Sequence, residues 1–384
     1  MKCAGKDEMR AQDRFRSVLI FGGAGFIGSN LAHHLLESTD AKVHVFDNLS
    51  RPGVRHNLQA LQRAARNPGR LQITVADVRD AAKVERAVRF ATEIYHFAAQ
   101  VAVTTSIDDP GLDFDVNLRG TFNILEAARR SGRRPFMLFT STNKVYGELA
   151  GHHIVEGETR YSFAGTSGIT EAQPLDFHSP YGCSKGAADQ YVRDYARVYR
   201  LPTVVFRMSC IAGPRQFGNE DQGWVAHFLY SALENQPLVL YGDGRQVRDV
   251  LCVEDLLRAF EAVRRNVAVS AGEIYNVGGG VENSVSLIEL IAMVEKLTGR
   301  PMEYAREDYR RGDQRIYITD YSRLARHTGW RAEVSVPATL EKIYSWWRRN
   351  RESLAAMFAP VPASSVRVFS RPIATLAIQQ RPAS

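Results

Sequence analysis

The sequence predicts an α/β protein in which a doubly wound parallel sheet is followed by a smaller α/β lobe. Residues 18–21 form an apolar stretch that runs directly into a glycine-rich turn. Stretches typical of strands and of helices then alternate as far as Arg207, and the alternation stops after that residue. Parallel strands need a crossover between them, usually a helix, so this alternation indicates a parallel sheet with helices on its faces.

Length and composition predict how the chain is divided. The 384 residues, of which 45% are hydrophobic, suffice for one large or two fused globular domains. We expect a polar extension over residues 1–16, the sheet domain over 17–208, and the smaller lobe mainly over 209–351, with some chain returning to the sheet domain. Prolines spaced among alanines and serines predict a mobile tail over 352–384.

Composition also argues against several classes of protein. No apolar run approaches the length of a membrane span, and residues 1–16 lack the apolar core of a secretory signal, which predicts a cytoplasmic protein without a membrane partner. The four cysteines lack the spacing of metal ligands, so we expect reduced thiols and no metal site. The net charge of +7 lies in residues 1–16 and 348–384, so the folded body carries no net basic charge and nucleic-acid binding is not expected.

The glycine-rich turn predicts a dinucleotide site. Gly22, Gly25 and Gly28 lie between the first strand and a helix expected over residues 26–37. Such a turn needs one glycine to bend sharply and one to let backbone amides approach a pyrophosphate. A third allows close packing of the helix on the strand.

The end of the second expected strand, residues 42–46, indicates which dinucleotide binds. It is followed by Asp47, whose carboxylate lies at the sequence distance expected for accepting the ribose hydroxyls. A carboxylate there would repel a 2′-phosphate, so NAD is favoured over NADP. Arg51 lies nearby and leaves NADP as an alternative.

Later strands should bring further residues to the same edge of the sheet, where open α/β sheets bind their ligands. Strands are expected over residues 71–75, 93–97 and 136–140, and a helix over 110–131. Thr142 could bind a substrate hydroxyl or could only cap its strand. The residues expected near a ligand here are Asp77, Val78, Ala98, Ala99, Gln100, Asn117, Ser141 and Thr142.

A tyrosine and a lysine lie four residues apart at the start of a long expected helix. Tyr181 and Lys185 should share one face of this helix. The ammonium group would hold the phenol partly as phenolate at neutral pH, by charge proximity and a shared ribose hydroxyl, so that the tyrosine can act as an acid or a base. The spacing by itself is weak support, because amphipathic helices produce it by chance.

Taken together, these stretches resemble the extended short-chain dehydrogenase/reductase superfamily, in its nucleotide-sugar epimerase/dehydratase branch. The resemblance covers about residues 17–351 and implies a Rossmann-type domain, NAD as cofactor, a nucleotide-sugar substrate, and a homodimer. The dimer would form through the helix after Asn117 and the helix that begins at Tyr181. Residues 141–146, 175–190 and 213–224 are most similar to members that invert C2 of a CDP-linked deoxysugar.

The resemblance assigns roles to individual positions. It implies Thr142, Tyr181 and Lys185 as the catalytic residues. The cofactor residues it implies are Gly22, Gly25, Phe26, Ile27, Gly28, Asp47, Asn48, Ser50, Arg51, Asp77, Val78, Ala98, Ala99, Gln100, Asn117, Thr140, Tyr181 and Lys185. The substrate residues it implies are Gln100, Thr142, Asn143, Lys144, His178, Ser209, Cys210, Arg215, Gln222, Trp224, Tyr241, Arg248 and Arg315.

Two departures from the branch bear on the reaction. Relatives that dehydrate the sugar carry an Asp-Glu pair after the threonine, whereas this chain has Asn143 and Lys144. Many C4 epimerases carry an asparagine where this chain has Cys210. We therefore expect an epimerase acting at C2 through a transient 2-keto sugar. The alternatives are a C4 epimerase, a net dehydrogenase or reductase of a nucleotide sugar, and, in a different class, an NAD-binding regulator without turnover.

The second lobe should hold the nucleotide. Residues 238–250 predict two short strands around a Gly-Asp-Gly turn, with Arg248 facing a diphosphate. Residues 310–315 predict a second arginine clamp or a solvated surface loop. The long loop over residues 151–173 is expected to cover the sugar site. Helices are expected over 223–234, 286–299 and 337–348.

Overall fold

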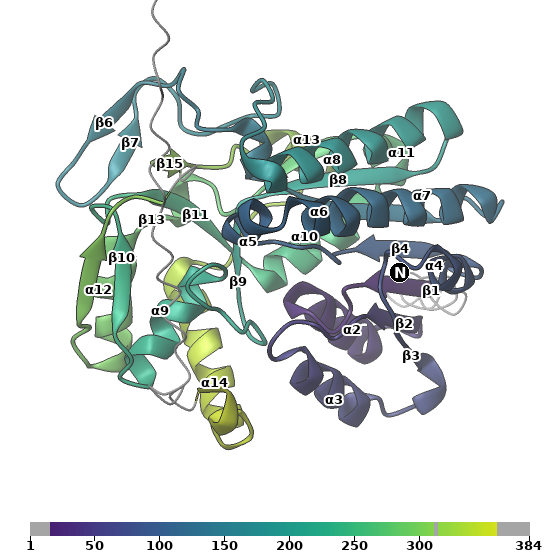
Figure 1. Ribbon diagram of the computed structural model, residues 1–384, viewed down its shortest axis with the longest axis horizontal. Coiled ribbons are helices and arrows are strands. Elements are labelled where there is room, and N and C mark those ends of the chain that lie inside the picture. The colour runs from purple at the N-terminus through teal and green to yellow at the C-terminus, as the bar shows by residue number, and fades with distance from the viewer. Residues whose placement is uncertain (1–15, 311–313, 359–384) are drawn as a thin grey trace, which may run out of the picture. The chain divides into compact units, whose positions relative to one another are not determined.

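The protein is built on a seven-stranded sheet, described over residues 16–310 and 314–358 of a computed structural model (Figure 1). The strand order is β12-β8-β5-β4-β1-β2-β3. All neighbouring pairs are parallel, which confirms the predicted Rossmann-type fold. The strands are β1 (Ser17–Phe21), β2 (Lys42–Asp47), β3 (Leu71–Val75), β4 (Glu93–His96), β5 (Phe136–Thr142), β8 (Thr203–Met208) and β12 (Ile274–Val277).

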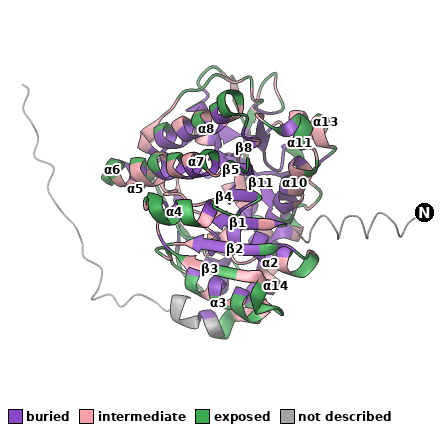
Figure 2. Cartoon of the chain, turned by 90° about the vertical axis from the view of Figure 1, so that its right-hand side faces the viewer, coloured by how far each residue is buried: buried purple, intermediate pink, exposed green. Residues whose placement is uncertain are grey.

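Helices cover both faces of this sheet. Alternate residues of a strand point to opposite faces: Val18 and Ile20 pack with α2, α3 and α10, and Leu19 and Phe21 pack with α4, α7 and α8. Figure 2 shows the inner strands of this sheet buried between helices with exposed outer faces, whereas the edge strand β3 is partly exposed. The helices are α2 (Phe26–Ser38), α3 (Val54–Ala64), α4 (Ala81–Val88), α7 (Gly120–Arg130), α8 (Ser179–Tyr199) and α10 (Val253–Arg265).

The helix expected over residues 110–131 contains a π turn. The order is α6 (Pro110–Phe114), a π-helical turn (Asp115–Arg119), and then α7. Such turns occur frequently at functional sites, because the extra residue redirects side chains locally. Here the turn carries Asn117, whose side chain is buried.

The second lobe contains two small sheets. In one, β11 (Val247–Cys252) pairs with β9 (Cys210–Ala212), β13 (Ser284–Ser286) and β15 (Ile316–Tyr317). In the other, β10 (Leu238–Tyr241) pairs with β14 (Tyr304–Glu307). The two predicted strands around the Gly-Asp-Gly turn therefore form, but each pairs elsewhere. The lobe's helices are α9 (Trp224–Leu233) and α12 (Leu287–Thr298).

The remaining elements connect these parts. The expected cover loop contains a hairpin of β6 (Ile154–Glu156) and β7 (Tyr161–Phe163). The short helices are α5 (Val103–Asp108), α11 (Val267–Ser270), α13 (Ser322–Thr328), and 3-10 turns at Pro68–Arg70, Asn143–Tyr146 and Val281–Asn283. None of the helices in the described residues combines the length and apolar character needed to cross a bilayer.

The C-terminal helix is longer than expected. It was predicted over residues 337–348, whereas α14 spans Val336–Phe358. The described residues up to Arg349 form one compact unit, and the described part of the second unit is the end of α14. The predicted tail otherwise lies outside the described residues, as do residues 1–15 of the expected extension. The boundary at residue 208, between the sheet domain and the smaller lobe, stays a prediction.

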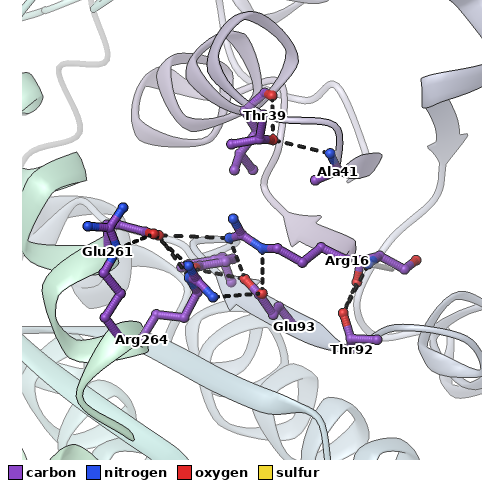
Figure 3. A network of polar contacts seen from close by, with 11 residues as sticks. Arg16, Thr39, Ala41, Thr92, Glu93, Glu261 and Arg264 are labelled. Carbon is purple, nitrogen blue, oxygen red and sulfur yellow. Dashed lines mark hydrogen bonds and ion pairs between the residues drawn. The ribbon is translucent and has the colours of Figure 1, made fainter. Parts of the chain in front are cut away.

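Arg16, assigned to the polar extension, is buried in an ion network at the amino-terminal end of the sheet (Figure 3). Its guanidinium donates to both carboxylate oxygens of Glu93 at 2.7 and 2.9 Å. Arg264 of α10 lies 3.7 Å from Glu93 and 2.6 Å from Glu261. These alternating charges connect the starts of β1 and β4 to α10, so Arg16 belongs to the folded body.

This network generates a prediction about stability. Glu93→Gln should lower the free energy of unfolding by roughly 3 kcal/mol, because it leaves the buried Arg16 guanidinium without its bidentate carboxylate. Urea denaturation monitored by circular dichroism measures this change. Arg265→Gln is the control: Arg265 pairs with Glu261 but is 55% exposed, so its loss should cost less than about 1 kcal/mol. If both variants lowered the free energy of unfolding by the same amount, the buried pair of Arg16 and Glu93 would have no special structural role.

Candidate active site

The carboxyl ends of the central strands open into a cavity of about 990 Å³. This volume lies at the upper end of the range for small-molecule sites. The cavity extends from the glycine-rich turn after β1 to Tyr241 at the end of β10. Most residues predicted for cofactor and substrate line it: Gly22, Gly25, Phe26, Ile27, Gly28, Asp47, Asn48, Ser50, Arg51, Asp77, Val78, Ala98, Ala99, Gln100, Thr140, Thr142, Asn143, Lys144, Tyr181, Lys185, Ser209, Cys210, Arg215, Gln222, Trp224, Tyr241 and Arg248.

The glycine-rich turn has the geometry of a phosphate site. Gly22 has a φ of +75°, and a Cβ there would lie 2.7 Å from the backbone nitrogen of Ala98. At Gly28 a Cβ would lie 2.2 Å from the carbonyl oxygen of Gly22. Both positions therefore exclude a side chain. The turn leads into the first residues of α2, whose free amides and helix dipole favour an anion.

Asp47 is oriented by the backbone at the edge of this turn. Its carboxylate accepts hydrogen bonds from the amides of Ala24 and Leu49 at 3.0 and 2.8 Å. Burial raises the pKa of Asp47, and these hydrogen bonds act against that rise. Arg51 also lines the cavity, but its guanidinium donates to the side chain of Gln222. The residues of this turn and Asp47 together fit a dinucleotide.

Asn117 was predicted to contact the cofactor, and the structure places it behind the cavity wall instead. It accepts from the amide of Gln100 at 2.9 Å and donates to the carbonyl of the same residue at 3.0 Å. It also donates to Asp113 and Ser184. A single side chain amide thus fixes the backbone after β4 to α6 and α8. Its role is to position the cavity wall at residues 98–100.

Thr142, Tyr181 and Lys185 come together at the end of β5 and the start of α8. The Tyr181 hydroxyl is hydrogen-bonded to Thr142, and burial raises the pKa of Tyr181 to about 12. Lys185 donates to the carbonyl oxygen of Thr140 at 2.6 Å and lies 4.1 Å from the centroid of the Phe139 ring. Burial lowers the pKa of Lys185 to about 7, although Asp189 and Asp113 raise it.

The expectation that Lys185, together with a shared ribose hydroxyl, holds Tyr181 partly as phenolate stays a prediction. The largest influence on the phenol is desolvation, which favours its neutral form. The lysine ammonium is directed to a backbone carbonyl. The phenol is consequently protonated at neutral pH, and a further positive charge near it would be needed to lower its pKa.

Several predicted substrate residues surround these catalytic groups. Ser209 donates to the carbonyl of Asp249 at 2.9 Å. Cys210 accepts from the indole nitrogen of Trp224 at 3.2 Å, and burial raises the pKa of its thiol. Asn143 donates to Gln314 at 3.4 Å. The groups are neutral and hydrogen-bonded, which suits a sugar ring.

Of the three arginines predicted to bind the substrate, two line the cavity and one does not. Arg248 is buried, lines the cavity, and donates to the carbonyl oxygens of Val247 and Gln314. Arg215 lines it too and donates to Asn30 at 2.9 Å. Arg315 does not line it, because its guanidinium lies 5.6 and 5.8 Å from the ring centroids of Tyr161 and Tyr309.

Arg310 takes the place expected for Arg315 in the cavity wall. Both belong to the arginine cluster predicted over residues 310–315, so the sequence carried the signal. It could not tell which arginine faces the ligand. Residues 311–313 of this cluster lie outside the described residues.

His178 and the expected cover loop also lie away from the cavity. His178 is paired with Asp176 at 3.0 Å and is 41% exposed. Within the described chain, no residue from 151 to 173 lines the cavity. The hairpin in this segment is held elsewhere, because Arg160 binds Glu289 of α12 and Ser284, and Tyr161 donates to Asp243 at 2.6 Å.

Sequence reasoning missed several residues of the cavity wall. They lie in the loop between β9 and α9, on α9, or near the turn after β10. Part of this loop was already singled out by the resemblance of residues 213–224, but no role was assigned to the residues between Arg215 and Gln222. Among the missed residues are Phe217, Glu220, Asp221, His227, Phe228 and Gln246.

The described residues bring together no group of three or more His, Cys, Asp or Glu side chains that could hold a metal ion. What the cavity offers is a dinucleotide turn, a buried hydroxyl, phenol and amine, and a second lobe bearing arginines. This arrangement can move a proton between a hydroxyl and a phenol next to a bound dinucleotide. Such proton transfer next to a dinucleotide is what the oxidoreduction of an alcohol requires.

Comparisons with known proteins agree with this geometry. Residues 19–343 match the family described as GDP-mannose 4,6 dehydratase. The CDP-paratose 2-epimerase of Salmonella typhi is 42% identical over 337 residues, which cover 86% of this chain and 98% of that protein. The dTDP-glucose 4,6-dehydratase of Neisseria gonorrhoeae is 34% identical over 357 residues, which cover 88% and 96%.

The solved structures similar to this chain include nucleotide-sugar enzymes with bound cofactor. The UDP-glucose 4-epimerase of Thermus thermophilus, solved in complex with NAD, is 33% identical, with a TM-score of 0.71. The match covers 86% of this chain and 99% of that chain. The chain therefore belongs to the GDP-mannose 4,6-dehydratase family of extended short-chain dehydrogenase/reductases, which includes NAD-dependent nucleotide-sugar epimerases and dehydratases.

Proposed function

We propose that this protein is an NAD-dependent epimerase that inverts C2 of a CDP-linked deoxysugar through a transient 2-keto sugar. The observation that carries the proposal is the meeting of Thr142, Tyr181 and Lys185 in a cavity that continues to the glycine-rich turn. The similarity to CDP-paratose 2-epimerase supports the choice of base and carbon. A net dehydrogenase or reductase and a C4 epimerase remain competing functions.

The neighbours of the catalytic residues favour epimerisation over dehydration. Loss of water from the sugar requires an additional acid and base, which the dehydratases in this branch supply as an Asp-Glu pair after the threonine. Here Asn143 bonds Gln314, and Lys144 follows it in the cavity wall. Neither is a carboxylate. The redox residues are complete, so oxidation and reduction of the sugar are retained without elimination.

The residues that would hold NAD are those of the turn after β1 together with Asp47. The turn presents backbone amides to a pyrophosphate, and the Asp47 carboxylate accepts ribose hydroxyls. When bound, NAD supplies a hydride acceptor and donor and a positively charged ring. Asn117 keeps residues 98–100 in the position that forms one wall of this site.

Proton movement is the task of Tyr181 in this proposal. In its phenolate form, Tyr181 takes the proton of the sugar C2 hydroxyl, and the phenol so formed returns that proton in the reverse step. The Thr142 hydroxyl, already bonded to Tyr181, orients the sugar hydroxyl toward the phenol. A positive charge nearby lowers a phenol pKa, and Lys185 lies one helical turn away. Arg248 and Arg215 of the second lobe would hold the diphosphate while the sugar turns.

A homodimer is also proposed, through α7 and α8. The rings of Phe122 and Tyr191 on these helices are 42% and 46% exposed, and their centroids are 6.1 Å apart. Aromatic side chains are common at protein interfaces.

The cytoplasmic location of this protein stays a prediction.

Cofactor identity can be measured directly. Denaturing the purified protein should release NAD or its reduced form, because the negative charge of Asp47 repels a 2′-phosphate. Mass spectrometry of the released nucleotide distinguishes the two dinucleotides. Recovery of mainly NADP or its reduced form would show that Arg51 rather than Asp47 decides cofactor choice.

Tyr181→Phe should reduce turnover of the nucleotide sugar by about two orders of magnitude or more, the usual size of a general acid/base effect. The bound dinucleotide should stay in place, because the variant removes only one hydroxyl. Tyr191→Phe is the matched control on the same helix, at an exposed position outside the cavity, and should turn over normally. Near-normal turnover of Tyr181→Phe would remove Tyr181 from the mechanism.

The inverted carbon and the fate of its hydrogen can be followed in deuterated water. A CDP-3,6-dideoxyhexose should epimerise at C2 without taking up deuterium there, because the same hydride leaves and returns. NMR of the product reports both the configuration and the isotope. Deuterium at C2 would indicate proton abstraction from carbon, and inversion at C4 would favour the C4-epimerase alternative.

A further inference from the structure

The cavity ends, far from the glycine-rich turn, in a cluster around Tyr241. Tyr241 is the last residue of β10. In Figure 1, β10 lies on the left, and β1 and α2 lie on the right. The Tyr241 hydroxyl donates to the carboxylate of Glu220. The Arg310 guanidinium carbon lies 3.9 Å from the centroid of the Tyr241 ring, and Arg310 pairs with Glu220 at 3.3 Å and with Asp221 at 3.2 Å. All four residues line the cavity.

A buried hydrogen-bond acceptor without a partner lies at the same end of the cavity, on the side chain of Gln246. Gln246 is 4% exposed and lines the cavity. Its side chain nitrogen donates to the carbonyl oxygen of Tyr241 at 2.5 Å. A carbonyl oxygen only accepts, so this bond fixes the orientation of the amide. The other end of the amide, Oε1, is buried with no hydrogen-bond partner. A ligand that places a donor here would satisfy it.

Charge determines which part of a nucleotide sugar fits this end. The sugar ring must lie near Thr142 and Tyr181, which carry out the proposed chemistry. The diphosphate would be repelled by the carboxylates of Glu220 and Asp221. The uncharged base is the part that remains. Tyr241 and the planar guanidinium of Arg310 provide the kind of flat surface on which bases stack.

We propose that Glu220 determines base specificity by accepting a hydrogen bond from the exocyclic amine of cytosine. The inference rests on the proposed function and assigns the recognition of its nucleotide. Cytosine carries an amine donor at position 4, whereas uracil and thymine carry a carbonyl acceptor there. A carboxylate accepts from the cytosine amine and repels that carbonyl. Tyr241 and Arg310 hold the Glu220 carboxylate in the cavity.

The test is the affinity of the dinucleotide-loaded protein for CDP and for UDP, measured by isothermal titration calorimetry. The wild-type protein should bind CDP about tenfold or more tightly than UDP, the size of discrimination one such base contact provides. Glu220→Gln should bring the two affinities to within about twofold, because the amide can present either a donor or an acceptor. Glu220 is about half exposed, so this variant should fold.

Asp221→Asn is the matched control. Asp221 is the adjacent carboxylate and also pairs with Arg310, so its replacement changes the charge by the same amount. It should keep the wild-type ratio of CDP to UDP affinity. A Glu220→Gln variant that retains the wild-type ratio, or an Asp221→Asn variant that loses it equally, overturns the proposal.

The test of Glu220 can fail while the test of the proposed function succeeds, and the two results can be told apart. If the protein epimerises a CDP-sugar at C2 and Glu220→Gln still prefers CDP, only the role of Glu220 fails. If the wild-type protein binds CDP and UDP equally, base recognition at Glu220 also fails, whereas turnover of the sugar still decides the reaction.

Discussion

All seven strands of the central sheet run in the same direction, and the position of the site follows from this constraint. Parallel strands place their carboxyl ends at one edge. The turn after β1, Asp47 after β2, residues 98–100 after β4 and Thr142 at the end of β5 therefore meet in one cavity, although they are far apart in sequence. The π turn at Asn117 adds a crosslink that holds one wall of this cavity to α8.

Burial is the second constraint on the chemistry. It favours the neutral form of both ionisable groups proposed to be catalytic, raising the pKa of Tyr181 to about 12 and lowering that of Lys185 to about 7. In such a poorly solvated site, a single added charge has a large effect, because little water screens it. Burial thus disfavours the phenolate of Tyr181, and Arg51 acts against this effect. A positive charge brought by a ligand would favour the phenolate further.

Local patterns were sufficient to predict the sheet and the central residues of the site. The glycine spacing, Asp47 and the Tyr181 to Lys185 separation each have one geometry once strand and helix are assigned. Arg315 and Arg310 were not distinguishable, since the side of the chain that faces the ligand depends on how β14 and β15 pair with distant strands. The hairpin at Tyr161 was misplaced for a similar reason. Its contacts with Asp243 and Glu289 are distant in sequence.

The residues proposed for redox chemistry and those proposed for base recognition lie on different kinds of structure in this protein. Thr142, Tyr181 and Lys185 are buried on the sheet edge and on α8. Glu220 and Asp221 lie on an exposed part of the loop between β9 and α9. Substitution on a loop disturbs the core little, whereas substitution at the sheet edge disturbs packing and hydrogen bonds together. Under these two proposals, substitutions on the loop between β9 and α9 could change the preferred nucleotide, while the residues at the sheet edge and on α8 stay the same.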